Sequence, residues 1–304
     1  MNNELRRYNI LVTGANGQLG REIKQLVINQ KNTFEKNNLT FYFTTKDQVD
    51  ITNKKEIEEF VKTNNINIII NCAAYTAVDK AETEAKIADA INHLAVKYLA
   101  EISKERDISL IHISTDYVFD GKNYKPYVET DPTNPQSIYG KTKLAGEKAI
   151  QSINPPNSII IRTSWVYSEF GNNFVKTMLR VGKERDSLKV VYDQIGSPAY
   201  TRDLAKAILQ IIQHSTFNIQ HLIQIYHYSN EGVCSWFDFA KEIIQMANLN
   251  CKVEPIETKE YPTPANRPHY SLLNKAKIKR DFQIEIPYWK DSLSDCLKRL
   301  GEKR

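Results

Sequence analysis

The sequence predicts an α/β protein with a Rossmann-type, doubly wound parallel sheet and a smaller C-terminal α+β lobe. Through the first half of the chain, short runs rich in Ile and Val alternate with helical segments. Such strands are typical of a parallel sheet that helices cover on both faces. A glycine-rich turn joins the first strand to the first helix. After about residue 162 the alternation gives way to helices joined by short β segments and Pro-containing loops, which indicates a second lobe.

Each expected strand is a short apolar run, and each expected helix is a longer segment of mixed polar and apolar residues. The strands are expected at residues 8–12, 40–44, 67–70, 109–113 and 158–161, and the helices between them at 18–29, 54–64, 82–105 and 136–150. Further helices are expected near 172–185, 201–214 and 236–248. Asp50 or Thr52 is expected to cap the helix at 54–64. The Asn- and Lys-rich stretch 29–38 is expected to form a surface loop.

The composition is ordinary for a folded globular protein. Its 304 residues, with 41% hydrophobic and 25% charged side chains, allow one large or two modest domains and exclude disorder for the bulk of the chain. The net charge of +5 is scattered along helices, so no nucleic-acid-binding surface is expected. No apolar run approaches the ~20 residues of a membrane helix. The N-terminus lacks the apolar segment of a secretory signal, so a cytoplasmic protein with free cysteines is expected.

The glycine-rich turn predicts a dinucleotide site. Gly14, Gly17 and Gly20 follow a strand and open a helix, with GxxGxxG spacing. Gly14 permits the tight turn, Gly17 lets a pyrophosphate approach the backbone N–H groups of the helix N-terminus, and Gly20 lets the helix pack close to the sheet. Residues 1–165 are therefore expected to form an NADP(H)-binding domain. Residues 166–304 are expected to form mainly a substrate-binding lobe, with the chain crossing between the lobes.

The end of the second strand bears on the choice between NADP and NAD. A carboxylate is expected there if the adenosine ribose carries a free 2′-hydroxyl. The chain reads Thr44-Thr45-Lys46 instead, with Asp47 one step later. A lysine without a clear carboxylate tolerates a 2′-phosphate, which favours NADPH and leaves NADH open. Asp50 is expected beside the adenine ring, with a simple helix cap as the alternative.

A proton-transfer group is predicted from three residues. Tyr139 and Lys143 lie four apart at the start of a helix and so share one face. Thr115 ends the fourth strand, where side chains of such sheets face the cofactor crevice. The Lys143 ammonium and an oxidised nicotinamide are expected to lower the pKa of Tyr139 from its usual ~10. Thr115 is expected to bind a substrate carbonyl oxygen, and Lys143 to contact the nicotinamide ribose.

These residues resemble the extended, nucleotide-sugar-modifying branch of the short-chain dehydrogenase/reductase superfamily. Further stretches are similar to the dTDP-4-dehydrorhamnose reductase family: CAAYTAVDKAE, STDYVFDG, YGKTKLAGE, RTSWVY, GNNFVKTML, DQIGSP and YPTPANRP. The resemblance runs from about residue 9 to residue 300. It therefore covers both lobes and points to the enzyme family as well as to the fold.

The resemblance implies a role for each matching residue. The implied cofactor-binding residues are Gly14, Asn16, Gly17, Gln18, Leu19, Gly20, Asp50, Ile51, Ala73, Ala74, Thr76, Tyr139 and Lys143. The implied catalytic residues are Thr115, Tyr139 and Lys143, and the implied substrate-binding residues are Thr115, Asp116, Trp165, Asn172, Asn173 and Arg267. Trp165 would stack on the sugar and Arg267 would pair with the diphosphate. A core tryptophan and a surface ion pair are the respective alternatives.

The implied activity is reduction of the C4 keto group of dTDP-4-dehydro-L-rhamnose to dTDP-L-rhamnose, the last step of dTDP-rhamnose synthesis. A nucleotide-sugar dehydratase of the same fold is disfavoured, because those enzymes carry Thr-Asp-Glu where this chain has Thr115-Asp116-Tyr117. The remaining alternative is a non-catalytic regulatory subunit like that of methionine adenosyltransferase. Family members also suggest a homodimer and, in some cases, Mg²⁺ held by glutamates between subunits, for which no ligands are assigned here.

Overall fold

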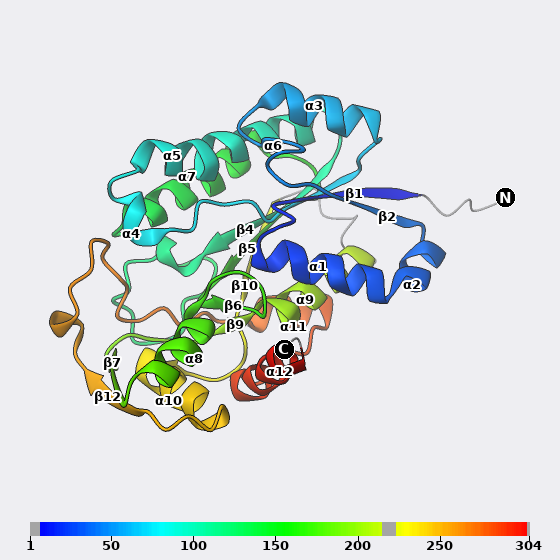
Figure 1. The fold of residues 1–304 in the computed structure, drawn as a ribbon. Helices are drawn as coiled ribbons and strands as arrows, with labels where there is room; N and C mark the ends of the chain where they lie inside the picture. The colour runs from blue at the N-terminus through cyan, green and yellow to red at the C-terminus, as the bar shows by residue number, and fades with distance from the viewer. Residues whose placement is uncertain (1–6, 215–222, 303–304) are drawn as a thin grey trace.

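A parallel six-stranded sheet forms the centre of the molecule in the computed structural model, which describes residues 7–214 and 223–302 (Figure 1). Its strands are β1 (Tyr8–Thr13), β2 (Leu39–Phe43), β3 (Ile68–Asn71), β4 (Ser109–Thr115), β5 (Ile159–Thr163) and β10 (Gln224–Tyr228). They lie in the order β10-β5-β4-β3-β1-β2, and every neighbouring pair is parallel. The predicted fold class is confirmed.

Helices cover both faces of this sheet (Figure 1). One face carries α1 (Gln18–Asn29), α2 (Lys31–Lys36), α9 (Thr201–Gln213) and α11 (Ala276–Phe282), and the other carries α3 (Lys54–Thr63), α4 (Val78–Ala81), α5 (Ala85–Asp89), a π-helical turn (Ala90–Leu94), α6 (Ala95–Glu105) and α7 (Ile138–Ile153). Successive residues of a strand point to opposite faces. Accordingly, Ile10 and Val12 belong to one apolar core and Leu11 belongs to the other.

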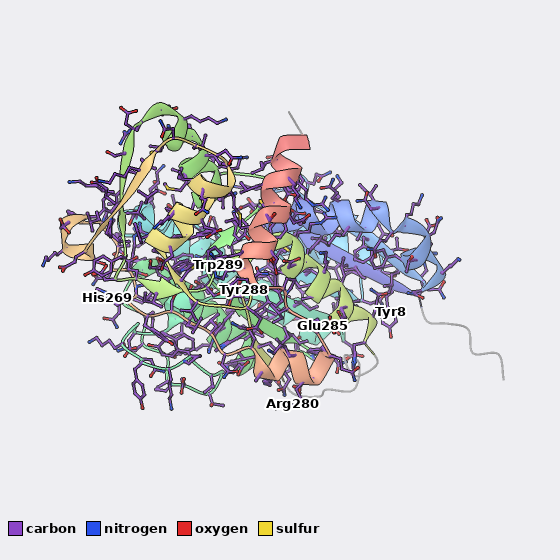
Figure 2. All side chains as sticks on the ribbon, turned by 90° about the horizontal axis from the view of Figure 1, so that it is seen from below. Tyr8, His269, Arg280, Glu285, Tyr288 and Trp289 are labelled. Atoms are coloured by element: carbon purple, nitrogen blue, oxygen red, sulfur yellow. The ribbon has the colours of Figure 1, made fainter. Side chains whose placement is uncertain are left out.

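A second lobe lies beside the carboxyl ends of the strands and has its own core. Its elements are β6 (Val166–Tyr167), α8 (Phe174–Glu184), β7 (Ser187–Val191), β8 (Ile195–Gly196), β9 (Ala199–Tyr200), β11 (Cys234–Ser235), α10 (Trp236–Met246), β12 (Lys252–Ile256) and α12 (Trp289–Glu302). Trp289 is 2% exposed and packs edge-on against Phe239 of α10. Figure 2 shows Trp289 at the start of α12 with Tyr288 next to it.

The chain returns from the second lobe to the first after residue 165. Helix α9 packs on α1, and β10 adds a sixth strand to the sheet beside β5, although both elements follow residue 165. The sequence interpretation missed β10 as a strand, because QIYHY lies outside the regular alternation of the first half. The proposed domain ranges also include residues 1–6, 215–222 and 303–304, which lie outside the described residues. The boundary near residue 165 stays a prediction.

Two local expectations were wrong. The expected surface loop at 29–38 contains α2, because Phe34 is buried and packs edge-on against Phe41 of β2. Helix α3 is capped by Asn53, whose side chain accepts from the backbone N–H of Lys55, and not by Asp50 or Thr52. The expected long helix at 82–105 forms as an unbroken helical run over residues 85–105, with the π-helical turn at Ala90–Leu94 in its middle. The other predicted elements of the first lobe agree to within about three residues.

The described part of the chain contains no helix that is both long and apolar enough to cross a membrane. The four cysteines are free thiols, as expected.

Candidate active site

The turn between β1 and α1 has the geometry of an anion site. Gly14 has a φ of +65°, and a Cβ there would lie 2.7 Å from the backbone nitrogen of Ala73. Only glycine therefore fits this close approach of two backbones. Gly17 precedes α1 with no side-chain cap, and the first turn of the helix has no acidic residue. The first backbone N–H groups of α1 are thus left for a ligand, as phosphate binding at a helix N-terminus requires.

The other residues expected around the cofactor lie close to this turn. Asn16 and Gly17 are exposed, whereas Leu19 and Gly20 are buried against the sheet. Ala73 and Ala74 are half-buried in the loop after β3, with Thr76 exposed farther along. The structure therefore brings the loop after β3 against the glycine turn, as the carboxyl ends of neighbouring parallel strands require.

The segment after β2 is organised by Asp50. Its Oδ1 accepts from the backbone N–H and the hydroxyl of Thr52 at 2.9 and 2.8 Å. Burial raises the pKa of Asp50, but the bonds from Thr52 and the charge of Lys46 outweigh it and leave the pKa lower than usual. Ile51 is 7% exposed and belongs to the apolar core. Asp50 is thus an ionised turn residue, and Ile51 is primarily a packing residue.

Thr115 and Tyr139 meet at the carboxyl end of β4. The Thr115 side chain donates to Asp116 Oδ1 at 3.0 Å and accepts from the Tyr117 N–H at 3.2 Å. Tyr139 lies in the first turn of α7, which Ser137 caps. Burial raises the pKa of Tyr139 above its usual value, and hydrogen bonding with Thr115 opposes this rise. The predicted hydroxyl pair is therefore brought together.

Lys143 is buried below this pair and is 2% exposed. Its Nζ donates to the carbonyl oxygen of Ile113 at 2.6 Å and lies 3.3 Å from His112 Nε2. Burial lowers the pKa of Lys143 to about 8, against the opposing charge of Glu147. The expectation that Lys143 lowers the pKa of Tyr139 is not met in this structure. The ammonium is held by β4, and burial governs the phenol.

Asp116 is the acid nearest to the trio. It is 2% exposed, and burial raises its pKa to about 6. The Thr115 hydroxyl, which donates to Asp116 Oδ1, and the nearby hydroxyl of Ser271 act in the opposite direction. Ser271 comes from the second lobe, so Asp116 lies where the two lobes meet, as a sugar-binding residue in an interlobe crevice should.

Trp165 occupies a strained position after β5. Its φ is +46°, a conformation that is costly for a bulky residue. Its ring stacks on that of Trp236 at 3.8 Å with an interplanar angle of 11°. A Cβ on Gly196 would lie 2.9 Å from the indole and 2.8 Å from Ser271 Oγ. The stacking and the missing side chain at Gly196 fix the indole beside Ser271, the residue of the second lobe near Asp116.

Arg267 is paired across the crevice. Its Nη2 lies 2.7 Å from Asp79 Oδ2 on α4, and both side chains are partly exposed. Nearby residues line a cavity of about 190 Å³, among them Tyr117, Gln136 and His269. Arg267 itself lines this cavity, and its ion pair with Asp79 ties the loop of the second lobe to the first lobe.

The two candidate asparagines differ. Asn173 caps α8 by accepting from the Lys176 N–H at 3.1 Å, and it donates to Gln18 Oε1 at 2.9 Å. Asn172 is exposed. Asn173 therefore links the second lobe to the cofactor turn, and substrate contact by either amide stays a prediction.

Sequence reasoning missed several residues of the site: Asn71, Asp79, His112, Trp236 and Ser271. Asn71 and His112 interrupt the apolar runs IIIN and LIHI, and each is at most 1% exposed. A polar residue inside a buried strand was the available signal. The contacts of Trp236 and Ser271 depend on the packing of the second lobe, which the sequence pattern does not specify.

No metal centre is supported. Among residues 7–214 and 223–302, no three His, Cys, Asp or Glu side chains gather closely enough to hold an ion. The buried glutamates Glu22 and Glu169 are accompanied by Arg202 and Arg299. Those guanidinium groups supply the positive charge that a cation would otherwise bring, so the Mg²⁺ that some family members suggest is not supported here.

Comparison with known proteins agrees with this geometry. A dTDP-4-dehydrorhamnose reductase of Aggregatibacter actinomycetemcomitans is 41% identical over 94% of this chain and 97% of its own. The crystal structure of a dTDP-4-dehydrorhamnose reductase from Clostridium acetobutylicum is 42% identical, with a TM-score of 0.88 over 96% of this chain and 99% of that one. The Bacillus anthracis dTDP-4-dehydrorhamnose reductase, solved in complex with NADP, is 38% identical, with a TM-score of 0.88 over 97% of this chain and 100% of that one. The profile described as "RmlD substrate binding domain" matches residues 8–302, and the chain therefore belongs to this family, that of the dTDP-4-dehydrorhamnose reductases.

Proposed function

We propose that this protein reduces the C4 keto group of dTDP-4-dehydro-L-rhamnose with NADPH and so forms dTDP-L-rhamnose. The observation that carries the proposal is the meeting of Thr115 and Tyr139 at the end of β4, one helical turn from the buried Lys143. Several relatives of this length and similarity carry the reductase name, and one of them was solved in complex with NADP. When bound, NADPH supplies the hydride that the keto carbon receives.

The residues of the first lobe fit that cofactor. The uncapped N-terminus of α1 and the close approach at Gly14 suit a pyrophosphate. Lys46 is exposed just after β2. The end of β2 itself carries threonines and no carboxylate that would repel a 2′-phosphate. NADPH is therefore the preferred cofactor in this proposal, and NADH is the competitor against which it is tested.

Three side chains do the proton chemistry. The Thr115 hydroxyl donates to Asp116 Oδ1 in this structure, and in the proposal it turns that proton to the keto oxygen and fixes the substrate against Tyr139. The high pKa of Tyr139 keeps its phenol protonated at neutral pH, so that Tyr139 gives its proton to the alkoxide oxygen as it forms. Lys143, which does not lower the pKa of Tyr139 in this structure, would contact the nicotinamide ribose and exchange protons with Tyr139 between turnovers.

The sugar nucleotide would lie between the lobes. Asp116 and Trp165 would contact the sugar, with Asn172 and Asn173 at the edge of the site. Arg267 would pair with the diphosphate, a pairing suited to a guanidinium fork. Because Arg267 is bound to Asp79 in this structure, the diphosphate must compete with that carboxylate.

The alternative is a regulatory subunit without turnover. The complete trio of Thr115, Tyr139 and Lys143 weighs against it, since a binding subunit does not need a positioned proton donor. A cytoplasmic location and a homodimer also belong to the proposal, by analogy with the family.

The deciding assay supplies enzymatically generated dTDP-4-dehydrorhamnose and follows the loss of NADPH absorbance. We expect turnover with NADPH and slower turnover with NADH. NADPH binding without turnover would contradict the reductase proposal and support the regulatory one. Faster turnover with NADH would contradict only the cofactor assignment.

A further inference from the structure

Three polar residues form a row across the sheet below the cofactor turn. Thr13 of β1 is in register with Asn71 of β3, and Asn71 is in register with His112 of β4. Their exposed fractions are 0%, 1% and 0%. The row runs from the residue before Gly14 to β4, the strand whose Ile113 carbonyl accepts a hydrogen bond from Lys143. Nothing in the proposed chemistry so far uses this row.

The hydrogen bonds of this row have a direction. The Ala73 backbone N–H can only donate, and it contacts Asn71 Oδ1 at 3.3 Å. The Thr13 hydroxyl donates to the same oxygen at 2.7 Å. The amide nitrogen of Asn71 therefore faces His112 Nδ1, at 3.1 Å. An amide nitrogen donates, so His112 Nδ1 must accept.

The direction fixes the tautomer of His112. Burial and the nearby Lys143 charge lower the pKa of His112 well below its usual value, so the ring is neutral. A neutral imidazole with an accepting Nδ1 carries its proton on Nε2. That N–H lies 3.3 Å from Lys143 Nζ. An N–H donor facing this position favours the neutral amine, which can accept, over the ammonium, which cannot.

We propose that Asn71 and His112 are positioning residues that hold an Nε2–H against Lys143 and so set the proton state of that lysine. The inference rests on the proposed function for its catalytic meaning. It goes beyond that proposal by assigning control of Lys143 to residues that touch neither substrate nor cofactor.

The other titratable groups around Lys143 do not account for its proton state, because each is already paired or neutral. Glu147 lies one turn along α7 and favours the ammonium, but its carboxylate is paired with Arg162 of β5 at 2.7 Å and accepts from Ser114 at 2.5 Å. Tyr139 lies one turn back and is protonated. A lysine that titrates near neutral pH binds and releases protons readily, which suits a group that serves Tyr139 in each turnover.

The test measures the tautomer of His112 and the pKa of Lys143 directly. NMR of isotope-labelled histidine should place the His112 proton on Nε2, and NMR of labelled lysine should show Lys143 titrating near pH 8. Asn71→Asp keeps the acceptor for Thr13 and Ala73 but presents only oxygen to His112. The proton should then move to Nδ1, Nε2 should accept from the ammonium, and the Lys143 titration should rise by about one pH unit or more.

His112→Gln is the second variant, because its amide oxygen can also accept from Lys143 and should raise the titration in the same direction. His227→Gln is the matched control: His227 is equally buried, but it contacts the Tyr127 carbonyl and lies on β10. The basic limb of the reductase pH profile should move with the lysine in Asn71→Asp and stay in place in His227→Gln.

A wild-type His112 with its proton on Nδ1 would overturn the inference, as would a Lys143 titration that neither Asn71→Asp nor His112→Gln moves. If the NMR results hold and the wild-type protein shows no reductase activity, the proposed function fails and the local inference stands. The two failures are therefore distinguishable.

Discussion

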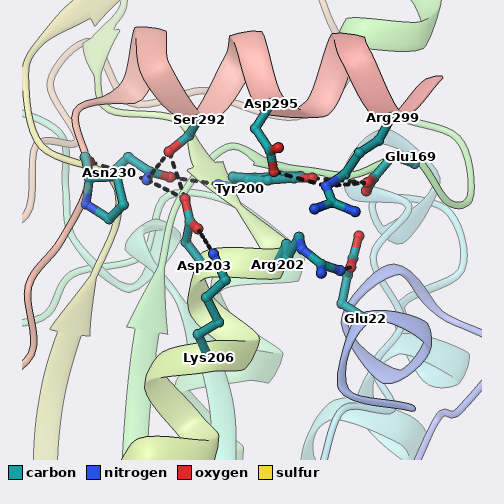
Figure 3. Close-up of polar contacts among 11 residues, drawn as sticks. Glu22, Glu169, Tyr200, Arg202, Asp203, Lys206, Asn230, Ser292, Asp295 and Arg299 are labelled. Carbon is teal, nitrogen blue, oxygen red and sulfur yellow. Dashed lines mark hydrogen bonds and ion pairs between the residues drawn. The ribbon is translucent and has the colours of Figure 1, made fainter. Parts of the chain in front are cut away.

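Two buried polar clusters of this molecule differ in how their polar groups are satisfied: one by hydrogen bonds between neutral groups, the other by ion pairs. The row Thr13–Asn71–His112 below Lys143 is neutral and joined by hydrogen bonds. The junction cluster, shown in Figure 3, lies where α1, α9 and α12 meet, and it is ionic. There Glu22, fully buried, accepts from Ser168 at 2.9 Å and lies 3.4 Å from Arg202 Nη1.

The junction cluster shows that a shifted pKa does not by itself locate an active site. Burial, followed by a hydrogen bond with Glu169, raises the pKa of Glu22 to about 8, the same value as that of Lys143. Yet Glu22 lies on the side of α1 that packs against the second lobe, and Asp203, Asn230 and Ser292 continue the cluster away from the crevice (Figure 3). The row below Lys143, by contrast, links the residue before the glycine turn to His112, which contacts Lys143. Changes in the crevice should therefore alter catalysis, and changes at the junction should alter stability.

Tyr139→Phe should give the largest effect. The phenyl ring keeps the packing with Tyr117, whose ring centroid lies 5.5 Å away, but it has no proton to give. Turnover should fall by at least ~100-fold, the usual contribution of a positioned acid. NADPH affinity, measured by titration, should be retained. A near-normal rate would show that another group donates the proton.

Arg267→Ala should come next. Loss of a charge-assisted hydrogen bond of about 1.5–3 kcal/mol should raise KM for the sugar nucleotide by roughly ten- to a hundredfold. Steady-state kinetics and an NADPH titration check this together. If both ligands weaken equally, Arg267 holds the lobes together and does not bind the diphosphate.

Asp79→Asn should act in the opposite direction and more weakly. The amide removes the carboxylate that competes for Arg267, so KM for the sugar nucleotide should fall a few-fold while kcat stays similar. The pair is partly exposed, which limits its strength. A rise in KM would mean that Asp79 positions Arg267 for the substrate instead of competing with it.

Glu22→Gln should leave turnover near neutral pH unchanged and alter only the pH dependence of stability. The folded chain holds a proton on Glu22 up to about pH 8, whereas an ordinary glutamate releases it near 4.5. The folded state therefore binds more protons between these values, and the free energy of unfolding should fall as pH rises through them. Glutamine has no such titration, so the variant should lose this slope and be more stable than the wild type above pH 8. Denaturant unfolding at several pH values checks both points, and an unchanged slope would contradict the assignment.

The sequence predicted the parts of the fold and site that local pattern specifies. The strand at Tyr8–Thr13, the glycine turn and the helix carrying Tyr139 and Lys143 depend on short-range periodicity and spacing, and all three formed as expected. The helix at Lys31–Lys36 depends on Phe34 finding a pocket against β2, a contact that a polar stretch does not reveal.

The electrostatics of the site were less predictable for the same reason. The spacing of Tyr139 and Lys143 suggested that the ammonium lowers the pKa of the phenol. In the structure, Lys143 Nζ contacts Ile113 and His112 of β4 instead, and those contacts depend on how α7 packs against the sheet. The pairing of Arg267 with Asp79 joins residues 188 apart in the chain, and no local pattern indicates it.

The central claim is that this crevice transfers hydride to a keto sugar, and isotope transfer tests it most directly. The protein is incubated with NADPH deuterated at the nicotinamide C4 and with dTDP-4-dehydrorhamnose, and the sugar product is analysed by mass spectrometry. The account predicts deuterium at C4 of the sugar in the wild type and its near absence with Tyr139→Phe at equal cofactor occupancy. A sugar that gains no deuterium from the wild-type protein would contradict it.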